Sequence, residues 1–163
     1  MKFLRIWRRV PPLVHEQADL LREEVTVVLA REGLAPSEET GRECTLFILW
    51  SVHAGLMNIR PALVRNALLW LHRRKVAHTA RAGDPDLLPL YERRRIEALY
   101  AVRNIFAEQT PRDWMLPLSS RLARMFIRNA SAGAQQVSRS AIEEVLRILR
   151  HRSSACVGAL LSA

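Results

Sequence analysis

The predicted fold depends most on the stretch HAGLMNIRPALVRNALLWLHRRKVA, residues 53–77. Apolar residues recur every three or four positions on both sides of a short break, which is typical of two amphipathic helices joined by a turn. The break falls at 58–61 because the residue before a proline avoids helical backbone and Pro61 suits the start of a new helix. We expect Asn58 to adopt a positive φ in this turn and Ile59 to plug it.

The spacing of the apolar residues also predicts which side chains of the two helices face the core and which face outward. We expect the inner face of the first helix to hold Ala54 and Met57. The second helix, over 61–75, returns to the core at Val64, Ala67, Leu68 and Leu71, and Trp50 joins that core from the preceding turns. The outward positions are polar or basic: Arg60, Arg65 and Asn66, followed by Arg73, Arg74 and Lys75.

Residues 64–71, VRNALLWL, resemble the second helix of the helix-turn-helix in winged-helix transcriptional regulators of the gluconate-repressor (GntR) type, which reads V-R-x-A-L-x-x-L. The resemblance covers only 53–77. It implies a small DNA-binding regulator that places Arg60, Arg65 and Asn66 at the groove and Arg73, Arg74 and Lys75 on phosphates.

Two features depart from that family. Arg60 and Pro61 occupy the places of its phosphate-contacting serine and arginine, and Leu69 and Trp70 are apolar where a groove-facing helix is polar. The chain after residue 93 is also shorter than the usual ligand-binding domain of the family. The alternative is a buried helix whose Leu-Leu-Trp-Leu run belongs to the core.

The net charge of +9, from 25 Lys and Arg against 16 Asp and Glu, favours a polyanionic partner. Only Lys2 and Lys75 are lysines, and arginine is the better bidentate donor to phosphate. The charge is segregated: 1–10, 46–83 and 114–163 are basic, whereas 11–45 is acidic. We therefore expect a positive face.

The whole chain predicts a mainly α fold, with about six amphipathic helices around one core in a single domain, 1–163. The expected helices are 14–33, 41–57, 61–75 and 93–109, one from Leu118 to near Gly133, and one from Ser140. Thr40 with Glu43 and Ser140 with Glu143 have the spacing of capping boxes. The run LFILW at 46–50 should be buried on all sides, and Ile142, Val145, Leu146 and Leu149 should form the buried stripe of the last helix.

Residues 76–92 allow two interpretations. VAHTAR and LLPLYE around the turn signal AGDPD would form a small β-wing, as in a winged helix. Alternatively, Asp84 and Pro85 begin another helix, with Pro89 in its first turns.

The two ends of the chain are expected to be a basic arm, 1–10, and a short apolar tail, 155–163. The arm alternates arginine with Phe3, Leu4, Ile6 and Trp7, so it suits either reversible contact with a membrane surface or, as we prefer, packing of Trp7 on the domain. The apolar residues Val14, Ala18, Leu21, Val25 and Val28 form a regular seam that suits another helix, including one across a homodimer.

No pattern in the sequence predicts catalysis or a cofactor. His15, Asp19 and Glu23 share one helix face, but no further ligand is placed beside them, so we expect no metal site. Cys44 and Cys156 have no metal-type or redox-type spacing, and His72 and His78 beside the basic run suit phosphate contact or plain exposure. No apolar run is long enough for a membrane span, and we expect a cytoplasmic protein.

These features together predict a non-enzymatic helical protein that binds nucleic acid, with double-stranded DNA as the expected ligand. The alternative is a protein–protein adaptor or assembly subunit, whose basic face binds an acidic partner or whose Leu69 and Trp70 form the contact.

Overall fold

The computed structural model describes residues 2–94, 120–131 and 136–162, and these residues form helices and turns without any strand. The helices are α1 (Lys2–Arg31), α2 (Glu38–Met57), α3 (Ala62–Gly83), α5 (Ser120–Ala130) and α6 (Arg139–Leu161). Residues 87–94 are also helical. The mainly α fold class is therefore confirmed. Most of the helix expected over 93–109, and the start expected at Leu118, lie outside the described residues.

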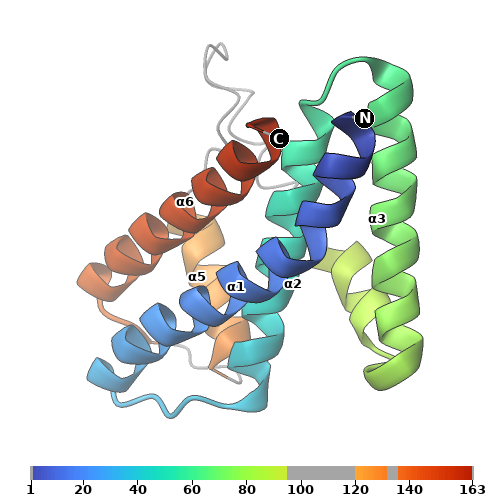
Figure 1. Ribbon diagram of the computed structural model, residues 1–163. Coiled ribbons are helices and arrows are strands. Elements are labelled where there is room, and N and C mark those ends of the chain that lie inside the picture. Colours follow the sequence, from blue (N-terminus) through green and yellow to red (C-terminus); the bar gives the residue numbers. More distant parts are fainter. Residues whose placement is uncertain (1, 95–119, 132–135, 163) are drawn as a thin grey trace.

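The central helix is α2, with α1, α5 and α6 packed around it and α3 alongside (Figure 1). All five residues of the LFILW run are buried, as expected. A helix that is apolar on every side must be covered on every side. The largest core cluster accordingly takes residues from five helices, including Leu21, Ile48, Leu68, Phe126 and Leu149.

Residues 2–10 are the first turns of α1 and not a separate arm, because Ile6 and Val10 are buried in the core. Pro11 and Pro12 lie inside α1 and do not end it. Proline removes a backbone donor and kinks a helix, which accounts for the change of direction along α1 in Figure 1. The seam from Ala18 to Val28 is buried within this chain, where α1 meets α2 and α6, so it provides no surface for a dimer.

The first turn of α2 differs from the expected capping box of Thr40 and Glu43. The N-cap is Ser37, whose backbone N–H donates to Thr40 Oγ1 over 3.1 Å. Thr40 Oγ1 donates in turn to the Ala130 carbonyl at the end of α5, over 2.7 Å. Glu43 instead forms a buried ion pair with Arg94, with Nε 2.8 Å from Oε1. The helix begins at Glu38 because Ser37, whose backbone is extended, is the N-cap residue. The carboxylates of Glu38 and Glu39 in the first turn favour the positive end of the helix.

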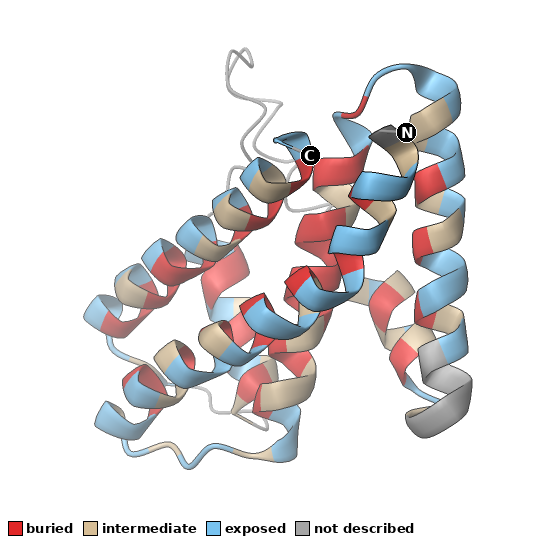
Figure 2. Cartoon of the chain, in the orientation of Figure 1, coloured by how far each residue is buried: buried red, intermediate tan, exposed pale blue. Residues whose placement is uncertain are grey.

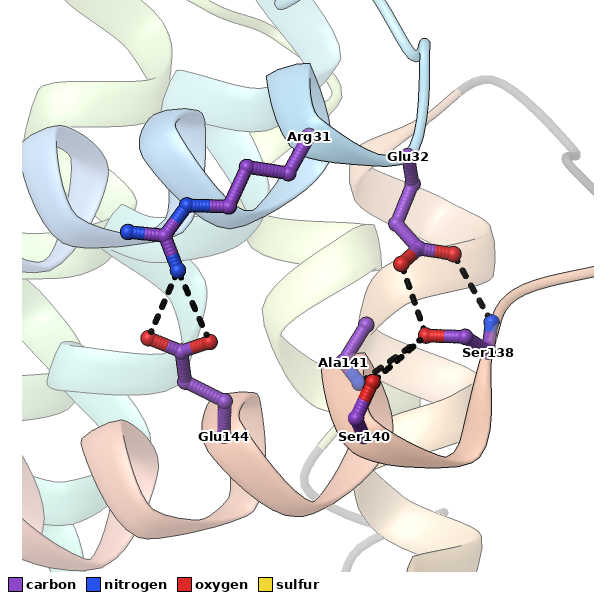
Figure 3. Close-up of polar contacts among 6 residues, drawn as sticks. All are labelled: Arg31, Glu32, Ser138, Ser140, Ala141 and Glu144. Carbon is purple, nitrogen blue, oxygen red and sulfur yellow. Dashed lines mark hydrogen bonds and ion pairs between the residues drawn. The ribbon is translucent and has the colours of Figure 1, made fainter.

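The N-cap of α6 is Ser138, and not Ser140 (Figure 3). Ser138 Oγ accepts from the Ala141 backbone N–H over 3.2 Å and donates to Glu32 over 2.7 Å, and the Ser138 backbone N–H donates to Glu32 over 2.8 Å. These bonds lower the pKa of Glu32. The end of α1 is thereby attached to the start of α6, and the expected buried stripe of α6 is confirmed from Ile142 to Leu149.

The break between α2 and α3 falls where the sequence predicted it, over residues 58–61, and Ile59 is buried as the expected plug. Asn58, however, has a φ of −87°, so the expected positive φ is wrong. Its backbone N–H reaches the Gly55 carbonyl and its side chain donates to the Ala54 carbonyl over 2.9 Å. Because these bonds cap α2 without reversing the backbone, the turn needs no left-handed residue. Met57 is exposed, and its expected inward position is also wrong.

The helices α2 and α3 form an antiparallel hairpin (Figure 1). His72 Nε2 lies 3.1 Å from the Leu49 carbonyl oxygen, and Val76 shares a core cluster with Leu46 and Leu49. Residues progressively farther from the turn thus meet along both helices. A helix-turn-helix crosses its helices at roughly 90–120°, so this pair has the expected break but a different arrangement, that of an αα-hairpin.

The expected β-wing over 76–92 is absent from the structure. Residues 76–83 continue α3, because Val76 extends its buried edge by one more turn. The helical interpretation from Asp84 is the better one: Asp84 Oδ1 accepts from the Asp86 backbone N–H over 3.2 Å. Pro89 falls in the first turn of the helical segment, where backbone N–H groups have no helical partner to lose.

The expected apolar tail is the last part of α6, where Cys156 and Leu160 are fully buried. It packs against α2 at Gly55: a Cβ there would lie 2.9 Å from Leu160 Cδ1 and 3.4 Å from Val157 Cα. Glycine is therefore needed at residue 55 for close approach of the two helices, although its φ is ordinary.

Candidate nucleic-acid interface

One edge of α3 faces the core and consists of Leu68, His72 and Val76, all buried. The His72 ring makes a hydrogen bond to the Leu49 carbonyl and packs edge-on against Tyr91, with ring centroids 6.0 Å apart. Burial, with a smaller effect from nearby His53, lowers the pKa of His72 to about 4. His72 is thus a neutral core residue, and the expected phosphate contact or exposure is wrong for it.

The opposite edge of α3 is exposed from Asn66 to His78, on the side that faces away from α2 (Figure 2). We call it the outer stripe, and its members are Asn66, Ala67, Trp70, Arg74 and His78. Trp70 lies at its centre with 58% of its surface exposed. An exposed tryptophan is unusual in a protein whose other described tryptophans pack against the core, so this edge is the natural candidate for a binding surface.

The outer stripe lies in a stretch that lacks acidic residues, since none occurs between Glu43 and Asp84. The Arg74 guanidinium carbon lies 5.1 Å from the centre of the Trp70 ring, in a cation–π contact. This contact orients a guanidinium and an indole side by side on the exposed surface. Such a pair offers a phosphate donor beside a flat apolar ring.

The two flanks of the outer stripe differ in charge. Arg73 on one flank forms an ion pair with Glu92, with Nε 2.9 Å from Oε1, so a neighbouring segment partly neutralises it. Lys75 on the other flank is exposed. Arg74 and Lys75 are therefore the exposed cations of this edge to consider for an anionic ligand.

The structure disperses the six residues predicted to bind nucleic acid along α3. Asn66 and Arg74 share the outer stripe, and Arg73 and Lys75 flank it. Arg60 is exposed in the turn before α3, and Arg65 is half-buried on the inward side. Five of the six residues therefore lie on more than one side of α3, with Arg60 in the turn before it, and the six do not form a compact cluster.

Sequence reasoning missed two features of this surface. Trp70 points outward, as the groove and adaptor interpretations expected, but Ala67, expected in the core, is exposed, and Leu69, expected to point outward, packs against the core. The four-residue spacing of Leu68, His72 and Val76 could have revealed that Ala67 faces outward. The pairing of Arg73 with Glu92 left no signal in the sequence, because it depends on where the segment after the turn folds.

The two thiols offer no reactive group on this surface. Cys44 and Cys156 are buried, and burial raises the pKa of each to about 12. A thiol is a nucleophile only when deprotonated, so both behave as small apolar residues.

In the described part of the chain, no group of three or more His, Cys, Asp and Glu residues could hold a metal ion. His15 and Asp19 lie 3.5 Å apart but form only an exposed pair on α1. None of the helices in the same residues is long and apolar enough to cross a membrane.

Comparisons of this chain with protein-family models, with curated proteins and with solved structures found no match.

Proposed function

We propose that this chain is a non-enzymatic protein that binds nucleic acid through the outer stripe of α3. The observation that carries the proposal is the placement of Trp70 and Arg74, in contact and exposed, on a helix edge within a stretch that has no carboxylate. A stretch without acidic residues favours phosphate binding, because a carboxylate beside Arg74 would compete for the arginine and repel the ligand, as Glu92 does at Arg73 on the flank.

Each residue of the surface suits a distinct contact. Arg74 and Lys75 would bind backbone phosphates, and the amide of Asn66 can pair with the edge of an adenine. The 22 residues of α3 span about 33 Å, enough for a helix to follow a DNA groove. Trp70 would cover a sugar or base beside the phosphates. Double-stranded DNA is the ligand that we expect.

The proposal is tested by titrating labelled random-sequence duplex DNA at several salt concentrations. Each phosphate contact steepens the dependence of the binding constant on salt by about 0.9 on logarithmic axes. The double variant Arg74→Ala with Lys75→Ala should bind less tightly and lose about two in that slope. The matched control removes two exposed arginines from α5, Arg124→Ala with Arg128→Ala, and should keep most of the wild-type slope.

Tight binding that both double variants weaken equally would mean that net charge alone, and not α3, holds the DNA. No measurable binding by the folded wild-type protein would reject the proposal.

A protein–protein adaptor is the second candidate, and the exposed Trp70 is the observation that favours it. Tryptophan and arginine dominate the energetics of protein interfaces. In that case DNA binding is weak from the start, and Trp70→Glu abolishes capture of an acidic protein partner. Leu69 is unsuitable for this test because it packs against the core.

A further inference from the structure

Four helix ends meet at one end of the molecule: the beginnings of α1 and α3 and the ends of α2 and α6 (Figure 1). Two contacts fix this arrangement. Arg9 Nη1 donates to the Ala159 carbonyl over 3.3 Å, joining α1 to the end of α6. Gly55 lets Leu160 approach α2 closely. Segments separated by up to 150 residues in the sequence are thereby placed together.

This end carries most of the large apolar side chains that are exposed in the described part of the chain. Of six such residues, four lie in these terminal turns: Leu4, Met57, Leu63 and Leu161, with exposed fractions of 55%, 51%, 84% and 49%. Their neighbours Ile6, Leu56, Ile59 and Leu160 are buried. Each terminal turn therefore has an inner side that completes the core and an outer side that presents an apolar group to its surroundings.

The same end is basic. The exposed arginines Arg5, Arg8 and Arg60 lie in these turns, and the segments 2–15, 44–83 and 145–162 contain no Asp or Glu. Three acid-free segments thus converge there. We call this surface the apolar–basic end, defined by Leu4, Met57, Leu63 and Leu161 with Arg5, Arg8 and Arg60.

We infer that the apolar–basic end docks reversibly on an anionic lipid surface. Leucine and methionine side chains suit the boundary between headgroups and acyl chains, and arginines beside them suit anionic headgroups. Leu63 lies one turn before Asn66 and Ala67, so this surface adjoins the outer stripe on α3. The inference does not depend on the proposed function, because it rests on the apolar side chains and arginines at four helix ends and not on Trp70 or Arg74.

Two other occupants fit the charges and apolar groups less well. Nucleic acid would satisfy the arginines but leave Leu4, Leu63 and Leu161 exposed to water. A second copy of this chain would place two basic, acid-free surfaces against each other, at the cost of like-charge repulsion. An anionic membrane surface uses both kinds of side chain.

The test is co-sedimentation of the full chain with two kinds of vesicle: phosphatidylcholine alone, and equal parts of phosphatidylcholine and phosphatidylserine. We expect binding to the anionic vesicles, decreasing with added salt, and little binding to the neutral ones. Arg5→Ala with Arg8→Ala should weaken binding about fivefold for each arginine, since a cationic side chain near an anionic surface is worth about 1 kcal/mol.

A second pair of variants tests the apolar contribution without changing charge. Leu4→Ser with Leu63→Ser should weaken vesicle binding at least tenfold, because two leucines lose their apolar burial. The control is Val27→Ser, an apolar residue near the other end of α1 that is about as exposed as Leu4, and this variant should bind as wild type does. All of these side chains are exposed, so circular dichroism and thermal unfolding should remain unchanged.

Equal binding to both kinds of vesicle, or an equal loss with Val27→Ser, would overturn the inference. The inference is also overturned if the wild-type protein does not bind vesicles and the variant Leu4→Ser with Leu63→Ser loses binding to duplex DNA. The apolar–basic end would then be part of a nucleic-acid site.

Discussion

At the scale of single residues, His72 shows how burial changes a side chain's chemistry. The ring occupies a core position of α3, where its N–H donates a hydrogen bond to the Leu49 carbonyl and burial disfavours the protonated ring. His53, whose ring centroid lies 6.3 Å from that of His72, disfavours protonation of His72 further. The folded protein therefore holds His72 neutral at pH values where an unfolded chain protonates it.

This difference predicts acid sensitivity of the fold. The pKa of His72 is about 4 in the folded state against 6.5 in the unfolded chain, so the unfolded state binds more protons in this interval. Stability should therefore decrease as the pH falls from about 6.5 towards 4, by up to about 3 kcal/mol from this group. Urea unfolding at a series of pH values measures it.

The variant His72→Gln keeps an N–H donor but cannot be protonated, so its free energy of unfolding should change less between pH 7 and 5. The control His78→Gln alters an exposed histidine and should follow the wild-type pH dependence. An identical pH dependence in His72→Gln would show that other groups cause the acid sensitivity.

At the scale of helices, close contact between α2 and α6 depends on one glycine. Alanine in place of a helical glycine normally stabilises by up to about 1 kcal/mol. At Gly158, on the exposed side of α6 with no atom within 4 Å of a new Cβ, we expect that gain. At Gly55 the new Cβ meets buried Leu160 and the backbone of Val157, so overpacking should outweigh the gain.

We therefore expect Gly158→Ala to raise the free energy of unfolding and Gly55→Ala to lower it by about 1 kcal/mol. Chemical denaturation of the two variants beside wild type provides the comparison. Equal stabilisation by both substitutions would mean that the helices are farther apart than described.

The same scale shows what the sequence could predict. The break before Pro61 and the buried stripe of α6 follow from local rules, because proline geometry and helical spacing operate within a few residues. The arrangement of α2 and α3 does not, since whether two helices cross or lie antiparallel depends on what covers them. VAHTAR suggested a strand, but the core contact of Val76 outweighed that local preference.

The candidate site was predictable only in part, for a similar reason. The basic character of 60–75 can be read from the sequence. The outward position of Trp70 also follows from helical spacing, whereas the pairing of Arg73 with Glu92 depends on contacts between segments that fold against each other.

At the scale of the whole molecule, charge is organised by surface. The acidic residues of 11–45 are partly used in ion pairs that join helices, such as Glu24 with Arg152, whose atoms lie 2.7 Å apart. The region from 44 to 83 has no acidic residues of its own, which favours contact of Arg74 and Lys75 with an external anion, whereas Glu92 pairs with Arg73. That ion pair provides a test by gain of function.

The substitution Glu92→Gln keeps the shape of the side chain and releases the Arg73 charge at the edge of the outer stripe. Its matched control is Glu143→Gln, which releases Arg139 from an ion pair of the same 2.9 Å length on α6. Both variants lose one negative charge, but only Glu92→Gln loses it beside the outer stripe. A difference in DNA affinity between the two variants therefore reports the position of the interface.

The most direct measurement is the affinity for random-sequence duplex DNA of wild type, Glu92→Gln and Glu143→Gln across a series of salt concentrations. If the outer stripe of α3 binds nucleic acid, Glu92→Gln should bind more tightly and its salt slope should steepen by about one, while Glu143→Gln stays close to wild type. An unchanged or weaker affinity in Glu92→Gln, or an equal gain in both variants, would contradict the placement of the interface on α3.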